Sequence, residues 1–322
     1  MPNIIINSYC NQKCPYCFAQ DMMSGGNTNI TLKEFKKIFQ WLKKSECHHI
    51  GLIGGEPTLN PHLKDILMYI NEEKKTYALR ITIFTNGTNL KPIMPYVDGS
   101  YQFLININAP EHIGEDNAKK TIKGLELLKE RPEIKTVFGA TIFPGIENVE
   151  YILKLANEYN KPYIRISYAA PNAPEGVDKH QYYAEGKEIF YDFAMKSAAH
   201  GVKLWLDCNR IPICHYTQEE YNVIKLLLEN ANTIKNYCFP VIDIDKNGDA
   251  TACFGGGNGL KPKNIFDFED YGTLERNFYC NDMTQKALHN DAGKCKDCDA
   301  FKRMHCQGGC LAFSSYSNKD NI

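Results

Sequence analysis

Near its N-terminus the chain reads Ile5-Ile6-Asn7-Ser8-Tyr9-Cys10-Asn11-Gln12-Lys13-Cys14-Pro15-Tyr16-Cys17-Phe18, an apolar run followed by three cysteines. Cys10, Cys14 and Cys17 have the spacing Cys-x3-Cys-x2-Cys, which places three thiols on one short loop after a predicted strand. Three thiolates can bind three irons of a cubic iron–sulfur cluster, whereas a cluster that only transfers electrons usually has four thiolate ligands. The missing fourth thiolate predicts that another molecule binds the open iron.

A zinc site is the alternative for the same triplet, because Cys-x2-Cys pairs recur in zinc ribbons. Zinc would need a fourth ligand, and the nearest histidine in the sequence, His48, lies well beyond the loop. Two further features, which follow the triplet in the chain, favour the iron–sulfur interpretation.

The first feature is the turn Gly54-Gly55-Glu56-Pro57, which follows the apolar run Ile50-Gly51-Leu52-Ile53. Glycines at the end of a strand let the backbone approach a ligand closely. A carboxylate at this place can accept charge-assisted hydrogen bonds from a cationic amino group.

The second feature is a series of polar residues at later strand ends. The β-rich run of residues 79–84 ends in Thr85-Asn86-Gly87, which is a turn signal. Asn106 and Asn108 close the run of residues 103–108, and Asn148 follows another apolar run at residues 138–143. Asparagine both donates and accepts hydrogen bonds, so these side chains suit a polar ligand.

In this order, the cysteine triplet, the glycine turn and the strand ends resemble the radical SAM enzymes. The resemblance implies that the open iron binds the amino and carboxylate groups of S-adenosylmethionine (SAM), and that an electron cleaves SAM to methionine and a 5'-deoxyadenosyl radical. It also implies that Glu56 contacts the SAM amino group, that Tyr16 lies against the adenine, and that Asn106 and Asn108 replace a Ser-x-Asp pair at the ribose. The expected ligands of the catalytic cluster are Cys10, Cys14 and Cys17, and the expected cofactor-binding residues are Tyr16, Gly54, Gly55, Glu56, Pro57, Asn86, Asn106, Asn108 and Asn148.

Strand and helix patterns alternate from the N-terminus to about residue 208. Strands are predicted near residues 3–9, 48–53, 79–86, 101–108, 134–143, 162–168 and 202–207, with helices such as Thr31–Lys44, Gly114–Lys129 and Glu147–Tyr159 between them. Thr31 with Glu34 predicts a capping box.

Repeated βα units imply a parallel sheet, and the resemblance makes this α/β fold a partial (βα)6 barrel. We expect three regions: a barrel at 1–208, a bridging segment at 209–236 with a helix over 217–231, and a cysteine-rich domain at 237–322.

Cysteines crowd the C-terminal region, at Cys238, Cys253, Cys280, Cys295, Cys298, Cys306 and Cys310. A hairpin is predicted between Cys238 and Cys253, because Asn247-Gly248 is a strong hairpin turn signal. The region resembles the SPASM extension of radical SAM enzymes, which carries one or two auxiliary [4Fe–4S] clusters. The last four cysteines depart from that pattern, with seven residues instead of five between Cys298 and Cys306 and no cysteine after Cys310.

By that resemblance, Cys238, Cys253 and Cys310 share one auxiliary cluster, and Cys295, Cys298 and Cys306 hold another. Each set lacks one ligand. Cys280, Asp297 or Asp299 could complete the second set, and Cys208-x5-Cys214 could supply the first, or an iron could stay open for substrate. A single-cluster extension of the "twitch" type and a zinc ribbon built from the last four cysteines are the alternatives.

Composition limits the remaining possibilities. The chain has 322 residues, of which 43% are hydrophobic and 23% charged, which indicates a folded protein. A net charge of −1 gives no support for nucleic-acid binding. The sequence shows no apolar run long enough to predict a membrane span and no signal peptide. We therefore expect a cytoplasmic protein, in which thirteen cysteines indicate metal chemistry rather than disulfides.

The expected reaction is hydrogen abstraction from a substrate in an anaerobic cytosol, with an electron donor such as flavodoxin or ferredoxin. Enzymes with SPASM-type extensions mostly modify peptides, so maturation of a ribosomally made peptide, by crosslinking or side-chain oxidation, is the first hypothesis. The chain starts directly at the barrel, so a separate leader-peptide-binding protein is expected.

The alternatives are a small-molecule radical dehydrogenase or carbon-skeleton enzyme acting on an amino sugar or amino acid, and a non-catalytic iron–sulfur or zinc module. Polar candidates for the substrate cleft are Arg165, Tyr168, Asp207, Arg210 and His215.

Overall fold

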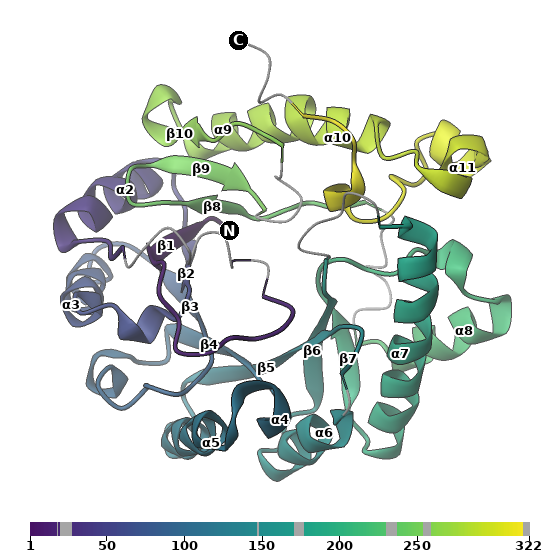
Figure 1. Ribbon diagram of the computed structural model, residues 1–322. Coiled ribbons are helices and arrows are strands. Elements are labelled where there is room, and N and C mark those ends of the chain that lie inside the picture. The colour runs from purple at the N-terminus through teal and green to yellow at the C-terminus, as the bar shows by residue number, and fades with distance from the viewer. Residues whose placement is uncertain are drawn as a thin grey trace.

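The computed structural model describes residues 1–17, 19, 28–146, 148–170, 177–229, 237–253 and 259–317. Its centre is one curved sheet with the strand order β10-β9-β8-β1-β2-β3-β4-β5-β6-β7. The strands trace an incomplete ring, with helices along its outer side (Figure 1). The strands are β1 (Asn3–Asn7), β2 (His49–Gly54), β3 (Arg80–Thr85), β4 (Tyr101–Asn106), β5 (Lys135–Ile142), β6 (Tyr163–Tyr168), β7 (Lys203–Leu206), β8 (Ile242–Ile244), β9 (Asp249–Ala252) and β10 (Lys263–Asn264).

Amphipathic helices cover the outer face of the sheet, as α2 illustrates. Thr31 caps α2 through a complete capping box with Glu34, and Phe35, Ile38, Phe39 and Leu42 form its buried face. The predicted capping box is confirmed. The helices are α2 (Leu32–Lys44), α3 (Leu63–Glu73), α4 (Pro110–Ile113), α5 (Glu115–Lys129), α6 (Val149–Glu158), α7 (Lys179–Ala199), α8 (Gln218–Leu227), α9 (Tyr271–Asn277), α10 (Thr284–Leu288) and α11 (Asp299–Lys302).

The strands from β1 to β7 run parallel, and each pairs with the next in sequence. The predicted α/β class is therefore confirmed, and each of these strands lies within one or two residues of its predicted range. The parallel part contains β7 in addition to the six units that the resemblance implies. The helix predicted over 217–231 begins as expected after Thr217, which caps it, but α8 ends at Leu227. Residues 230 and 231 lie outside the described residues.

The predicted C-terminal hairpin forms and joins the same sheet. Strands β8 and β9 pair antiparallel, and Gly248 in the turn has a φ of +86°, which glycine adopts without steric cost. On its other side β8 pairs parallel with β1, opposite residues Asn3 and Ile4. The sheet therefore continues across the expected boundary at residue 236/237.

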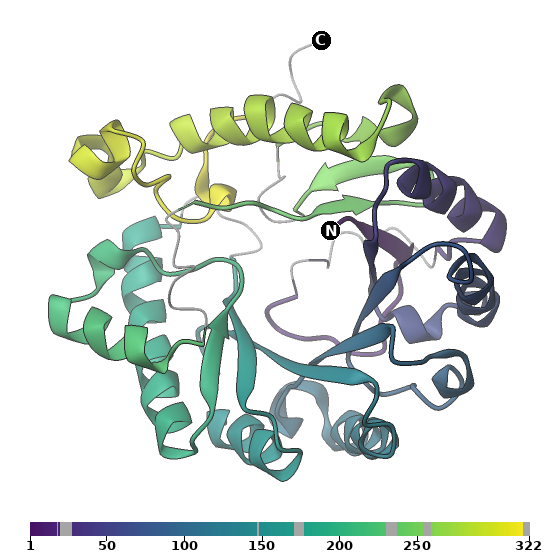
Figure 2. The same cartoon turned by 180° about the vertical axis from the view of Figure 1, so that it is seen from behind.

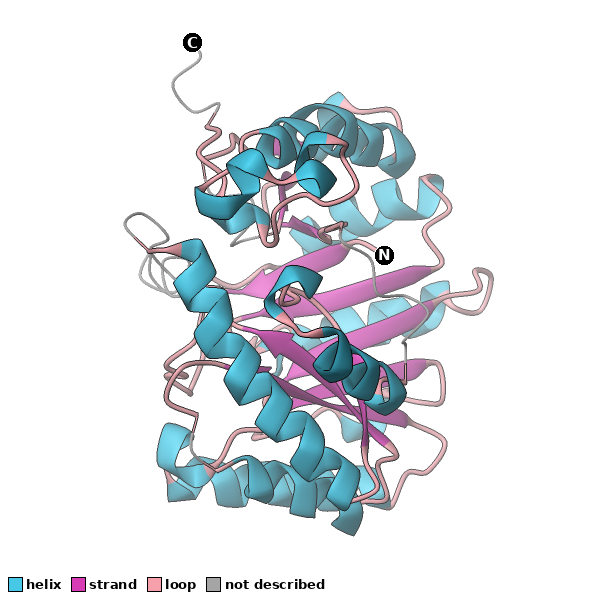
Figure 3. Cartoon of the chain, turned by 90° about the vertical axis from the view of Figure 1, so that its right-hand side faces the viewer, coloured by secondary structure: helices cyan, strands magenta, loops and turns pink. Residues whose placement is uncertain are grey.

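The later helices α9, α10 and α11 cross the gap between the hairpin and α7, which Figure 2 shows from behind. In the side view they lie at the top of the picture (Figure 3), and they contact α2, since the Tyr271 N–H of α9 donates to the hydroxyl of Ser45 at the end of α2 at 2.9 Å. Within the described ranges, no helix is both long and apolar enough to span a membrane.

Candidate cofactor site

The cysteine triplet lies on the loop after β1, on the inner side of the ring (Figure 1). Cys10, Cys14 and Cys17 are half-buried. The loop is closed locally, because the Cys17 N–H donates to the Cys14 carbonyl at 3.1 Å and the Gln12 N–H to the Cys10 sulfur at 3.4 Å.

Two predicted residues on neighbouring strand ends donate to the cysteine sulfurs. The Asn86 amide Nδ2, after β3, lies 3.8 Å from Cys10 Sγ. The Asn108 amide Nδ2, after β4, lies 3.7 Å from Cys14 Sγ. Hydrogen bonds to sulfur ligands stabilise their negative charge and tune an iron–sulfur cluster, so these amides suit thiolates.

Tyr16 connects the loop to the end of β4. Its hydroxyl donates to Asn108 Oδ1 at 2.5 Å and accepts a hydrogen bond from Asn106. Its ring lies 5.0 Å from that of Phe143, centroid to centroid. The surrounding protein raises the pKa of this phenol, so its hydroxyl stays protonated and orients both amides.

Gly54 and Gly55 let the loop pass directly over the end of β2. A Cβ atom on Gly54 would lie 2.5 Å from the Asn7 carbonyl oxygen, and one on Gly55 would lie 2.3 Å from that of Tyr9. The same backbones pair, since the N–H groups of Gly55 and Glu56 donate to the Asn7 and Tyr9 carbonyls at 3.1 and 2.7 Å. Any larger residue would push the cysteine loop away.

Glu56 joins the ends of β2 and β3 through a buried carboxylate. Its Oε1 accepts hydrogen bonds from the Thr58 N–H, the Thr58 hydroxyl and the Thr85 hydroxyl, and its Oε2 accepts one from the Asn86 N–H at 2.7 Å. Burial raises the pKa of this carboxyl, and the donated hydrogen bonds act against that rise. Pro57 begins a short 3-10 turn, Pro57–Leu59, after Glu56.

The residues around the triplet fit an anionic iron–sulfur cluster. Burial raises the pKa of Cys10 to about 11 and that of Cys14 to about 12, and the neighbouring thiols add to both shifts. A bound metal favours the thiolate and releases the proton. Among the described residues, the buried Gln12 Nε2 has no hydrogen-bond partner, which leaves a donor for a cluster sulfide.

No three Cys, His, Asp or Glu side chains within the described ranges are arranged to hold a single metal ion.

Asn148 is placed differently from the other predicted residues. Its exposed side chain caps α6 by accepting the Tyr151 N–H at 3.1 Å. Sequence reasoning missed the roles of Gln12, Thr58, Thr85 and Phe143. Only Thr85 carried a signal, since it stands directly before Asn86 at the end of a β-rich run.

The C-terminal cysteines come from several separate segments. Cys238 precedes β8, Cys253 follows β9, and Cys295 lies in the 3-10 turn Gly293–Asp297. Cys298 precedes α11, and Cys306 and Cys310 follow it. Cys280 lies in the π-helical segment Phe278–Met283 and is exposed.

The polar substrate candidates are largely engaged with the protein itself. Arg165 Nη2 pairs with Asp207 Oδ1 at 2.6 Å, and Arg210 donates to the Asp207 and Leu206 carbonyls. Tyr168 donates to the Tyr182 carbonyl at 2.9 Å. These contacts account for their positions structurally.

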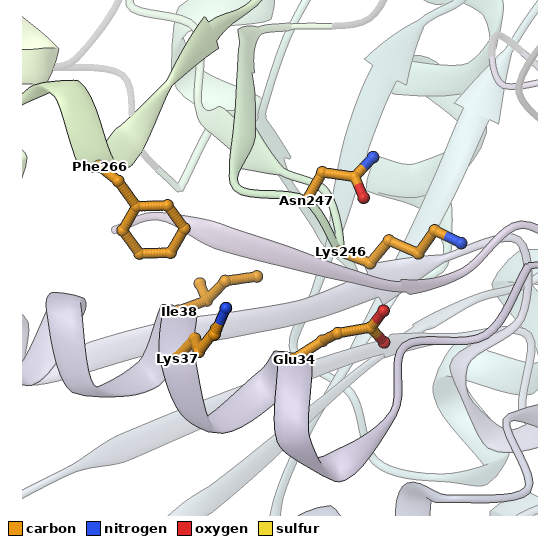
Figure 4. Close-up of a pocket in the computed structure, with 6 residues that line it drawn as sticks. All are labelled: Glu34, Lys37, Ile38, Lys246, Asn247 and Phe266. Carbon is orange, nitrogen blue, oxygen red and sulfur yellow. The ribbon is translucent and has the colours of Figure 1, made fainter.

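A surface hollow lies between α2 and the turn of the hairpin, lined by Glu34, Lys37, Ile38, Lys246, Asn247 and Phe266 (Figure 4). None of its residues is a predicted site residue, so the hollow marks the junction of α2 with the C-terminal region rather than the cofactor site.

The profile of the Radical SAM superfamily matches residues 4–159, the part that carries the triplet, the glycine turn and Asn86 to Asn148. This match covers just under half of the chain, and together with the parallel fold and the cysteine loop it makes residues 4–159 similar to the radical SAM superfamily. The family implies a [4Fe–4S] cluster and SAM.

Three similar proteins show how far the likeness extends. An S-adenosylmethionine-dependent nucleotide dehydratase of Fibrobacter sp. (strain UWH6) is 28% identical over 170 residues, 48% of this chain and 47% of that protein. Native anSMEcpe with bound AdoMet has a TM-score of 0.64 at 17% identity, covering 98% of this chain and 91% of the other. Streptococcus suis SuiB bound to precursor peptide SuiA has a TM-score of 0.56 at 15% identity, covering 87% and 64%. The chain thus spans about half of the curated relative, and the solved structures support the fold.

Proposed function

We propose that this chain cleaves SAM reductively and abstracts hydrogen from a substrate, with Cys10, Cys14 and Cys17 holding the catalytic [4Fe–4S] cluster. The cluster, when bound, supplies the electron that splits SAM into methionine and a 5'-deoxyadenosyl radical. The observation that carries this proposal is the support of Cys10 and Cys14 by the amides of Asn86 and Asn108.

The chain's own residues prepare this site. Gly54 and Gly55 let the loop lie against β2, and Tyr16 holds the Asn106 and Asn108 amides. Glu56 Oε2 accepts one hydrogen bond in the described contacts, and a carboxylate oxygen can accept a second, which suits the SAM ammonium. Pro57 and Asn148 are included in the cofactor-binding set on the resemblance alone.

We further propose a SPASM-type extension with auxiliary clusters on the C-terminal cysteines, and a ribosomally made peptide as substrate. The fold likeness to a protein solved with its precursor peptide supports the peptide hypothesis. A flavodoxin or ferredoxin as electron donor and a separate leader-peptide-binding protein complete this proposal.

A small-molecule substrate is the second candidate, because a curated relative is a nucleotide dehydratase. The two candidates differ in which compound stimulates SAM cleavage. Peptides encoded beside the gene should stimulate 5'-deoxyadenosine release in one case, and nucleotides, amino sugars or amino acids in the other.

The experiment is a SAM cleavage assay on anaerobically reconstituted protein with dithionite. Wild-type protein should release 5'-deoxyadenosine, measured by liquid chromatography, and Cys14→Ala should reduce release to background. Cys47→Ala is the matched control, since Cys47 is half-buried beside the core and away from the loop. Full cleavage by Cys14→Ala would contradict the proposal.

A further inference from the structure

Helix α7 presents two side chains, His180 and Tyr183, that connect the loop after β7 to the C-terminal region. Residues three apart lie on the same face of a helix. His180 Nδ1 lies 3.4 Å from His215 Nε2, and His180 Nε2 lies 3.8 Å from Cys295 Sγ. His215 follows Cys214 directly, so His180 brings the Cys214 loop close to Cys295.

Tyr183 makes the corresponding connection for a different pair of cysteines. Its fully buried hydroxyl donates to Asn209 Oδ1 at 3.0 Å and accepts the Cys310 N–H at 2.7 Å. Asn209 follows Cys208 directly, and Cys208 Sγ lies 3.5 Å from Ser167 Oγ. Cys208 and Cys310 are therefore held on the same side of α7.

Tyr183 places Cys208 beside Cys310, and the hairpin brings Cys253 beside Val241 near Cys238, since the Cys253 N–H donates to the Val241 carbonyl at 3.0 Å. These four cysteines form a first group, and their mutual electrostatic influence agrees with it. The pKa of Cys238 is raised well above its ordinary value, first by burial and then by Cys253, Cys310 and Cys208. Burial raises the pKa of Cys310 to about 11, with a contribution from Cys208. Surrounding protein, Asp207 and Cys253 raise the pKa of Cys208 to about 12, although its side chain remains accessible to solvent.

His180 places the Cys214 loop beside Cys295, and the Cys298 N–H donates to the Cys295 carbonyl at 3.1 Å. With Cys306 these cysteines form a second group: Cys214, Cys295, Cys298 and Cys306. Burial raises the pKa of Cys214, and the next causes are Cys306, Cys295 and Cys298. Burial also raises the pKa of Cys295, with contributions from Cys306 and Cys298.

A buried lysine accompanies each group. Lys179 is 3% exposed and lowers the pKa of Cys295, and Lys286 is 1% exposed and lowers that of Cys310. The Lys179 ammonium donates to the Asn290 carbonyl at 2.7 Å, and a positive charge at this place also suits an anionic iron–sulfur cluster.

We propose that each group is a four-thiolate [4Fe–4S] site, with Cys208 as the fourth ligand of the first and Cys214 as the fourth ligand of the second. The inference rests on the proposed auxiliary clusters and specifies their ligands. Both added ligands come from the loop after β7, where Cys208 and Cys214 are exposed as Cys280 is, so neither Cys280 nor Asp297 or Asp299 is needed.

The test uses the full chain with Cys10, Cys14 and Cys17 changed to alanine, reconstituted anaerobically, so that only the C-terminal sites are loaded. Iron per chain and the electron paramagnetic resonance (EPR) signals of the reduced protein are measured. This parent should hold about eight irons in two clusters. Cys208→Ala should change the signal that Cys238→Ala changes, and Cys214→Ala the signal that Cys295→Ala changes.

The double variant Cys208→Ala, Cys214→Ala should alter both signals, whereas Cys280→Ala, the exposed matched control, should alter neither. The inference is overturned if Cys208→Ala and Cys214→Ala act on the same signal, if either acts on none, if Cys280→Ala removes a signal, or if zinc replaces iron. The signal that each single variant keeps shows that the chain is folded. A variant that loses both is repeated as Cys→Ser, and a second loss of both also overturns it.

The result is independent of SAM cleavage. If wild-type protein releases no 5'-deoxyadenosine while the EPR signals sort as expected, the proposed function fails and the ligand assignment stands. If SAM cleavage occurs but the variants do not change the EPR signals as expected, the proposed function stands and the ligand assignment fails.

Discussion

The N-terminal cysteine loop takes its three thiols from residues 10–17, whereas the C-terminal thiol groups draw theirs from residues 208–310. In the loop, support comes from amides at the ends of β3 and β4. In the C-terminal region, support comes from His180 and Tyr183 on α7. The difference shows that one site is built mainly by local chain geometry and the other by tertiary packing.

Gly55→Ala should have the largest effect, because it should disturb the N-terminal cysteine loop and leave the C-terminal thiol groups unchanged. The new Cβ would lie 2.3 Å from the Tyr9 carbonyl oxygen, so the cysteine loop must move. A displacement near 1 Å at a reacting centre can cost about 100-fold in rate, and we expect a loss of that order in 5'-deoxyadenosine release. The C-terminal EPR signals should stay unchanged.

Gly272→Ala is the control for that variant, because its Cβ would have ordinary contacts, the nearest at 3.4 Å. Equal losses of cleavage in both variants would show that the close approach of Gly55 to the loop is unimportant.

Asn108→Asp tests whether the amide of Asn108 supports Cys14 in the N-terminal cysteine loop. The change replaces the N–H donor 3.7 Å from Cys14 Sγ with a carboxylate oxygen. Hydrogen bonds to charged groups contribute about 1.5–3 kcal/mol, so cleavage should fall about tenfold or more. The rate of 5'-deoxyadenosine release measures this loss.

Asn157→Asp makes the same chemical change on the exposed face of α6, where the amide contacts His200. It should leave cleavage unchanged. A similar fall in both variants would point to overall charge rather than to the Cys14 contact.

Asp243→Asn should have the smallest effect. It changes the stability of the folded protein through the contact between β8 and β1. Burial raises the pKa of Asp243 to about 7, and Asn3 Nδ2 of β1 donates to it at 2.8 Å. The folded state therefore keeps a proton that the unfolded state loses above about pH 4. The unfolding free energy should fall between about pH 4 and about pH 7, by at most about 1.4 kcal/mol per pH unit.

The asparagine variant removes this dependence and can donate to Asn3 Oδ1, which is buried without a partner in the described residues. Its melting temperature should exceed that of wild-type protein increasingly from about pH 5 to about pH 8. Asp267→Asn, on an exposed side chain, is the control. A constant difference across this range would contradict the assignment.

Much of the barrel was predictable because its signals are local. The run of residues 101–108 predicted β4, and Thr31 with Glu34 predicted the start of α2. The triplet, the glycine turn and Asn86 also lie where parallel strand ends should place them. Spacing along the chain was sufficient for these features.

Long-range contacts were not predictable in the same way. No pattern indicated that β8 would pair with β1 or that Tyr183 would bond to both Asn209 and Cys310. Asn148 was predicted as a cofactor-binding residue, and the structure shows that its side chain caps α6. The sequence could not separate these two roles, because a short polar side chain suits both.

The pairing of β8 with β1 has a consequence for how the chain is made. Strand β1 is made long before β8, and its outer edge lacks this partner until residues 242–244 follow. An open strand edge is a template for pairing with other chains. A truncated product that stops before residue 242 would keep that edge bare beside its cysteines, so premature termination should yield aggregates rather than a free-standing barrel.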